Sequence, residues 1–240
     1  MAFSQTAALN SGHRACQGCS EALGAGHAID GGTTDIGFGC LSGMFERNED
    51  VLYIRYDNGG YMNSGVQRSS ATPPPCARPP PCRSAPNQAT SSARENVPAI
   101  AMTHENPYVA SATVTDLRDL EHKVTKAMSL RGARYIHIQV PCPLGWGAAS
   151  SDTIRLACLA KETGVFPVFE AEGGEISGVL NIRRPLPVED HLRPQKRFAH
   201  LSAKYRRSYA IETGPFLVFF GGHFTLGRLG GPLTPAFRLT

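Results

Sequence analysis

The stretch that decides the fold runs from Asp30 to Asp57 and reads DGGTTDIGFGCLSGMFERNEDVLYIRYD, with Asn58 directly after it. A carboxylate and two glycines open the stretch, and the apolar residues behind them recur at helical spacing. The β-branched and aromatic run Val51–Asp57 then predicts a buried strand. The stretch therefore indicates a turn, a helix and a strand in succession, with the helix carried by Ile36, Phe38, Leu41, Met44 and Phe45.

The rest of the chain repeats this alternation of helices and strands. An apolar stripe predicts a helix over Asp116–Arg131, capped by Thr115 and ended by Gly132. Ser151 similarly caps a helix from Asp152 to about Thr163. Strands are expected over residues 96–101, 135–140 and 165–172. We therefore predict an α/β fold with a largely parallel sheet and flanking helices.

The composition excludes several classes of protein. Of 240 residues, 41% are hydrophobic and 18% are charged, which suits a globular chain and excludes a fully disordered one. No run of 18 apolar residues and no leader pattern stands out, so we expect a cytoplasmic protein without a membrane span. The net charge of +4 is too small to indicate nucleic-acid binding.

Two basic segments interrupt the otherwise mildly acidic chain. Residues 71–94 are rich in proline, with PPPCARPPP at their start, and predict an exposed loop of polyproline II character. Residues 201–240 place FLVFF among glycines and arginines and predict an irregular tail. We expect one domain over residues 1–200 that carries the proline-rich insertion, followed by the divergent tail.

Asp30 and Asn58 could form a magnesium site beside a diphosphate. A carboxylate at a strand end, followed by Gly31, Gly32 and a helix, lets backbone N–H groups approach phosphates. Mg²⁺ takes oxygen ligands, which Asp30, the Asn58 amide and a carbonyl near Gly60 could supply. The alternative is that DGG and DNGG are simply turns.

The seven cysteines are odd in number and include one close pair, Cys16-x-x-Cys19. In an intracellular chain they suggest thiols, a metal or a cluster rather than a disulfide framework. By itself one such pair is ambiguous among zinc binding, redox chemistry and chance.

Several separated motifs, in the right order, resemble the beta subunit of pyruvate:ferredoxin oxidoreductase, of the thiamine-diphosphate-binding 2-oxoacid:ferredoxin oxidoreductase family. The resemblance covers roughly residues 10–75 and 95–201. Its motifs are HRACQGCSEALGA, the stretch from Asp30 to Asn58, YMNSGVQRSSATPP, GARYIHIQVPCPLGW and RPQKRFAHL.

The resemblance implies a thiamine-diphosphate-binding fold and an oxidative decarboxylation of a 2-oxoacid, with pyruvate as the expected substrate, to an acyl-CoA. It assigns Mg²⁺ and the diphosphate to Asp30, Gly31, Gly32, Asn58 and Gly60. Asn63 would face the cofactor near the reacting carbon. A [4Fe–4S] cluster would be held by Cys16, Cys19 and Cys142. The implied partners are alpha, gamma and delta-type subunits, with ferredoxin, coenzyme A and pyruvate as reactants, and neither nucleic acid nor membrane.

The chain departs from the family pattern before Asp30. Only ten residues separate Cys19 from Asp30, where the family has a third cysteine ligand, a helix and the strand that leads into the glycine motif. We therefore expect an incomplete fold near the N-terminus and a cluster that lacks one ligand. An inactive truncated homologue, with part of the fold or an assembly role, remains an alternative, as does an interaction protein that uses the Pro/Arg run.

Overall fold

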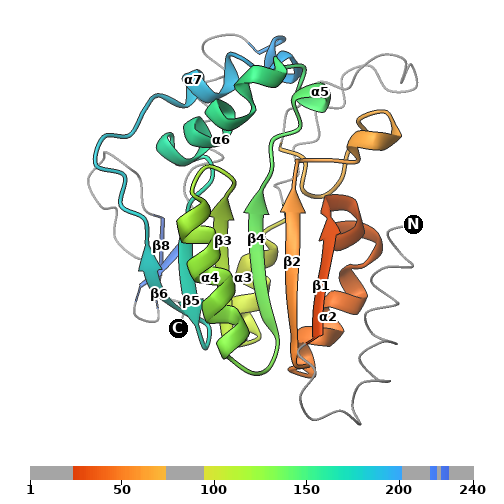
Figure 1. Cartoon of the computed structure of the whole chain (residues 1–240), viewed down its shortest axis with the longest axis vertical. Coiled ribbons are helices and arrows are strands. Elements are labelled where there is room, and N and C mark those ends of the chain that lie inside the picture. The colour runs from red at the N-terminus through yellow and green to blue at the C-terminus, as the bar shows by residue number, and fades with distance from the viewer. Residues whose placement is uncertain (1–23, 74–94, 202–216, 221–222, 227–240) are drawn as a thin grey trace.

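The computed structural model describes residues 24–73, 95–201, 217–220 and 223–226. A six-stranded sheet with the order β1-β2-β4-β3-β5-β6 runs through the first two ranges (Figure 1). Its first four strands in that order pair in parallel, and β5 and β6 join antiparallel. The strands are β1 (Gly24–Ile29), β2 (Val51–Asp57), β3 (Tyr108–Thr113), β4 (Arg134–Gln139), β5 (Phe169–Glu172) and β6 (Glu175–Val179). The predicted α/β class with a largely parallel sheet is confirmed.

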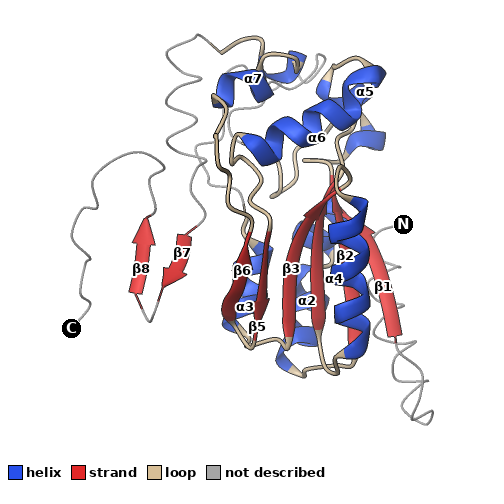
Figure 2. Ribbon diagram, turned by 60° about the vertical axis from the view of Figure 1, so that its left-hand side comes forward, coloured by secondary structure: helices blue, strands red, loops and turns tan. Residues whose placement is uncertain are grey.

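Helices cover both faces of the sheet and its carboxyl edge (Figures 1 and 2). The longer helices are α2 (Phe38–Glu46), α3 (Val97–Thr103), α4 (Leu117–Ser129) and α6 (Thr153–Glu162). The shorter elements are the π-helix η1 (Gly32–Ile36), the helices α5 (Pro143–Trp146) and α7 (Val188–Leu192), and the 3-10 turns η2 (Met62–Ser64), η3 (Ser150–Asp152) and η4 (Lys196–Phe198). In both views α5, α6 and α7 lie beyond the carboxyl ends of β2 and β4.

Two hydrophobic clusters hold the helices on the sheet. On one face, α2 and α3 pack through Leu41, Phe45 and Val97 against β2, β3, β4 and β5. On the other face, α4 packs through Ala127 and its neighbours against Leu52 and Ile136. Strands β3 and β4 are buried along their whole length, as expected of parallel strands that helices cover on both sides.

Several predicted elements are confirmed close to their expected bounds. The strand over Val51–Asp57 is β2, and the strand over 135–140 is β4, shifted by one residue. The helix expected over Asp116–Arg131 is α4, but Asp116 caps it instead of Thr115, because its carboxylate accepts from the Asp119 N–H. The helix expected over 152–163 is α6 after one 3-10 turn.

The strand predicted over residues 96–101 is wrong, because this segment forms helix α3. The Asn96 side chain accepts from the Ala99 N–H at 3.2 Å, and Pro98 stands in the first turn. Both are signals of a helix start. The sheet strand is instead β3 (Tyr108–Thr113), which was not predicted; its small residues give a weak strand signal, and burial between β4 and β5 stabilises it.

The expectation that the strand before Asp30 is missing is also wrong. Residues Gly24–Ile29 form β1, which pairs in parallel with β2 over its whole length. Six residues are enough for a strand at the sheet edge. The cysteine pair lies before this strand and outside the described residues.

The prediction of an irregular tail over residues 201–240 is wrong for two short segments. Strands β7 (Leu217–Phe220) and β8 (His223–Leu226) pair antiparallel as a separate two-stranded sheet. Residues 74–94, which make up most of the expected proline-rich loop, lie outside the described residues.

Candidate functional site

The candidate site lies at the carboxyl edge of the sheet, where β1 and β2 end side by side. Asp30 follows β1 directly, Asp57 is the last residue of β2, and the loop Asn58–Gly60 comes next. Ligands of open α/β sheets bind outside the carboxyl ends of the strands. The topology therefore brings the two halves of the predicted site together, although Asp30 and Asn58 are 28 positions apart in the sequence.

The Asp30 carboxylate is fully buried and accepts hydrogen bonds on both oxygens. Oδ1 accepts from Nε and Nη2 of Arg55 at 3.2 and 3.0 Å. Oδ2 accepts from the backbone N–H groups of Asn58, Gly59 and Gly60 at 2.7, 2.6 and 3.2 Å. Asp30 therefore fixes the course of the loop that follows β2.

Opposing effects act on the pKa of Asp30. Burial and the neighbouring Asp57 carboxylate outweigh the lowering by Arg55, so the net pKa is raised to about 7. Every contact described above is donated to the carboxylate, which favours its ionised form. The geometry therefore fits an anionic Asp30 that the Arg55 guanidinium stabilises.

Arg55 and His137 extend this network beneath the loop. Nη2 of Arg55 lies 3.4 Å from Asp57 Oδ2, and both side chains are buried. His137 Nε2, on the neighbouring strand β4, lies 2.7 Å from the same oxygen. Oδ1 of Asp57 accepts from the Gly59 N–H at 3.0 Å. Two carboxylates thus share one buried arginine under the loop.

Three polar atoms converge above Asp30 in a way that suits a small cation. One terminal atom of the Asn58 amide lies 2.8 Å from the Gly60 carbonyl oxygen and 2.9 Å from Asp30 Oδ2. With nitrogen in that place, the amide donates to both oxygens. With oxygen there, the Asn58 oxygen lies from each of the other two at the separation of neighbouring ligands in an octahedron of about 2.1 Å radius. Asp30, Asn58 and Gly60 therefore fit a Mg²⁺ ion.

Gly31 and Gly32 lead from Asp30 into η1, as predicted. The ring of Tyr61 lies against Gly31, so that a Cβ there would come within 1.9 Å of it. The Tyr61 hydroxyl donates to the Gly31 carbonyl at 3.2 Å. Asn63 lies on the same loop in η2, where its side chain is exposed. The structure thus gathers all the predicted magnesium and diphosphate residues at one corner.

Of the predicted cluster ligands, the described residues include only Cys142. It is half-buried at the N-cap of α5, and its Sγ accepts from the Gly145 N–H at 3.4 Å. Cys16 and Cys19 lie outside the described residues. In the described part of the chain, no three His, Cys, Asp or Glu side chains group to hold a metal. The described residues therefore do not form a cluster site by themselves.

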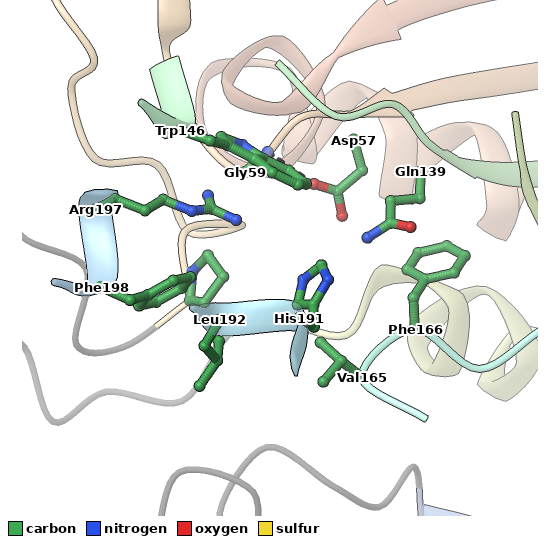
Figure 3. Close-up of a pocket in the computed structure, with 11 residues that line it drawn as sticks. Asp57, Gly59, Gln139, Trp146, Val165, Phe166, His191, Leu192, Arg197 and Phe198 are labelled. Atoms are coloured by element: carbon green, nitrogen blue, oxygen red, sulfur yellow. Dashed lines mark hydrogen bonds between the residues drawn. The ribbon is translucent and has the colours of Figure 1, made fainter. Parts of the chain in front are cut away.

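A pocket opens beside the Asn58–Gly60 loop, under α5 and α7 (Figure 3). Trp146 and Arg197 form one wall, and Gln139, Phe166 and His191 form the opposite side. Burial and Arg197 lower the pKa of His191 to about 3, so the imidazole is neutral at pH 7. The pocket joins two of the motifs that carried the resemblance, PCPLGW and RPQKRF.

Sequence reasoning missed Arg55 and His137. The signal for Arg55 was available, because it is the one cation inside the otherwise apolar and aromatic run VLYIRYD. A buried cation requires a partner charge. His137 had no comparable signal, since only the pairing of β2 with β4 brings it to Asp57.

In the part of the chain that the structure describes, no helix is long and apolar enough to cross a membrane. No protein-family model matches the chain.

Among curated proteins, the chain is 46% identical to the pyruvate synthase subunit PorB of Methanosarcina barkeri over 172 residues, which are 72% of this chain and 58% of that protein. It is 39% identical to PorB of Methanothermobacter marburgensis over 209 residues, covering 86% of this chain and 73% of that protein. It is also 39% identical to the ketoisovalerate oxidoreductase subunit VorB of Pyrococcus abyssi, over 74% of this chain and 58% of that protein.

The chain spans 58% of the length of the PorB proteins from Methanosarcina barkeri and Methanocaldococcus jannaschii. Among solved structures, it superposes on a 2-oxoglutarate:ferredoxin oxidoreductase from Magnetococcus marinus with a TM-score of 0.51 and 22% identity, over 58% of this chain and 46% of that one. This likeness supports the α/β fold. The identities with PorB and VorB, over most of the chain, show that it belongs to the family of beta-type subunits of 2-oxoacid:ferredoxin oxidoreductases.

Proposed function

We propose that this chain is the cofactor-binding subunit of a pyruvate synthase or a closely related 2-oxoacid:ferredoxin oxidoreductase. Its Asp30 corner would bind Mg²⁺ and the diphosphate of thiamine diphosphate. The observation that carries the proposal is that the Asn58 amide lies 2.8 Å from the Gly60 carbonyl oxygen and 2.9 Å from Asp30 Oδ2.

The residues of this chain would bind and orient the cofactor. Asp30, Asn58 and Gly60 would hold the metal, and the backbone of Gly31 and Gly32 would face the diphosphate. When bound, thiamine diphosphate supplies the nucleophile and the electron sink for decarboxylation of the 2-oxoacid.

Arg55 would keep Asp30 anionic and in place from beneath the metal. Asn63, exposed on the loop after β2, could turn toward the reacting end of the cofactor. Pyruvate, coenzyme A and ferredoxin would be the reactants, and alpha, gamma and delta-type subunits the partners.

The proposed cluster would use Cys16, Cys19 and Cys142. Anaerobic reconstitution of the full chain with iron and sulfide tests it, since a [4Fe–4S] centre gives broad absorption at about 400 nm. Cys142→Ser should then abolish the absorption. Cys158→Ser is the control and should keep it, because Cys158 is a half-buried residue of α6 and is not a predicted cluster ligand. A colourless product from the unmodified chain would contradict a cluster in this protein.

A binding experiment tests the metal and diphosphate site without the partner subunits. The full chain is titrated calorimetrically with thiamine diphosphate in the presence of Mg²⁺. Asp30→Asn should raise the dissociation constant by at least about tenfold, because it removes the one anionic ligand. Asp50→Asn is the matched control, since Asp50 pairs with Arg131 and Arg134 at the opposite end of β2.

The outcomes separate the two functional readings. Binding that Asp30→Asn weakens and Asp50→Asn preserves supports the cofactor-binding subunit. A full chain that folds but does not bind thiamine diphosphate with Mg²⁺ contradicts it and favours an inactive homologue.

A further inference from the structure

We propose that Trp146 and Arg197 form a clamp that positions the Asn58–Gly60 loop, so that its oxygens are preset for the metal. Neither residue would itself bind the metal. Trp146 contacts the loop backbone, Arg197 supports Trp146, and both line the pocket beside Gly59 (Figure 3). They are positioning residues, and the part of the inference that concerns metal affinity rests on the proposed function.

The first contact of the clamp is a hydrogen bond onto the loop itself. The Trp146 indole Nε1–H donates to the Asn58 carbonyl oxygen at 2.7 Å. The backbone N–H of the same residue donates to Asp30 Oδ2 at 2.7 Å. Asn58 is thus held from opposite sides, its N–H by Asp30 and its carbonyl by Trp146, and its side-chain amide is left to face Gly60.

The second contact stacks a cation on the indole. The Arg197 guanidinium carbon lies 4.0 Å from the centre of the Trp146 ring. Its Nε donates to Gln195 Oε1 at 2.8 Å, and Gln195 Nε2 donates to the His191 carbonyl oxygen at 2.6 Å. Gln195 is buried. Arg197 is therefore fixed from the α7–η4 segment before it reaches the indole.

The third feature of the clamp is the limited space beside Gly59, whose φ is +81°. A Cβ built on Gly59 would lie 3.0 Å from Arg197 Nη1 and 4.0 Å from Trp146 Nε1. The Arg197 guanidinium therefore lies next to the glycine that turns the loop. A larger residue would meet both the strained backbone angle and the guanidinium.

Together the contacts assign a role to two motifs that the metal site alone leaves unused. PCPLGW supplies Trp146, and RPQKRF supplies Gln195 and Arg197. Trp146 reaches the Asn58 carbonyl because β2 and β4 are neighbours in the sheet, and Arg197 in turn lies over the Trp146 ring.

The experiment uses two readouts on the full chain. Trp146→Phe keeps an aromatic ring for Arg197 but removes the N–H donor. Hydrogen exchange followed by mass spectrometry, without metal, should show the amides of residues 58–60 exchanging about fivefold faster. With thiamine diphosphate present, the affinity for Mn²⁺, measured from the spin-resonance signal of free Mn²⁺, should fall by about the same factor.

Tyr108→Phe is the matched control. It also removes one side-chain donor, since the Tyr108 hydroxyl donates to Glu170 at 2.7 Å, but it does so at the start of β3. It should leave both readouts unchanged. If Trp146→Phe does not fold, Arg197→Gln decides the question, with an expected two- to threefold effect in the same direction.

Unchanged exchange at residues 58–60 in the folded variant would overturn the clamp. Exchange that rises equally throughout the sheet would also overturn it, because it would show only a loss of global stability. If the unmodified chain takes up no Mn²⁺, the proposed function fails, while the exchange measurement still decides whether the clamp exists.

Discussion

Replacement of Arg55 by Met should destabilise the fold strongly. The Arg55 side chain is fully buried and lies 3.0 Å from Asp30 and 3.4 Å from Asp57. Methionine has a similar length but no charge, so two buried carboxylates would remain beside each other without a cation. Removing one partner of a buried ion pair costs about 3–5 kcal/mol.

The loss should depend on pH in a direction that the structure fixes. The pKa of Asp30 is already raised to about 7 by burial and Asp57, and without Arg55 it should rise further. A carboxyl whose pKa is higher in the folded than in the unfolded state lowers the free energy of unfolding as the pH rises from about 4 toward the folded pKa. The deficit of Arg55→Met should therefore be larger at pH 8 than at pH 5.5.

Urea unfolding followed by circular dichroism at the two pH values measures this effect. Arg131→Met is the matched control, because Arg131 also contacts an aspartate at 2.7 Å but its side chain is 60% exposed. An exposed pair contributes about 0–1 kcal/mol. A loss below about 1 kcal/mol for Arg55→Met, or a loss equal to that of Arg131→Met, would refute the buried-charge argument.

Two further predictions concern glycine packing and a buried histidine. Gly31→Ala should lower stability by about 1–3 kcal/mol in thermal unfolding, because its Cβ would meet the Tyr61 ring, and a second substitution, Tyr61→Ala, should recover part of the loss. By contrast, Gly39→Ala has open space in α2 and should stabilise the chain by about 0.5–1 kcal/mol; a loss at Gly39 would contradict the packing argument. The pKa of His191 is lowered to about 3 by burial and Arg197, so the unfolded chain binds the extra proton between pH 6.5 and 3 and stability falls as the pH falls through that window. Urea unfolding at pH 7.5 and 5.5 should show a decrease of about 1 kcal/mol from this group, and His191→Asn should reduce the pH dependence by that amount; an unchanged dependence would refute the assignment.

The pattern of the sequence predicted the elements whose signal is local. The run VLYIRYD predicted β2 because it combines β-branched and aromatic residues. The amphipathic stripe of α4 predicted its position to within a few residues. The prediction failed for segments with small residues. Tyr108–Thr113 and Gly24–Ile29 form strands because they pair with neighbouring strands.

The sequence by itself determined which groups could form the candidate site: a carboxylate before two glycines, an asparagine after the next strand, and the cysteines at 16, 19 and 142. The tertiary structure alone decided how these groups meet. The parallel pairing of β1 with β2 places Asp30 beneath the backbone of residues 58–60. Arg55 neutralises its buried charge, and Trp146 reaches the same loop from 88 residues away. Buried charges and hydrogen bonds depend on distances across the sheet, which spacing along the chain does not specify.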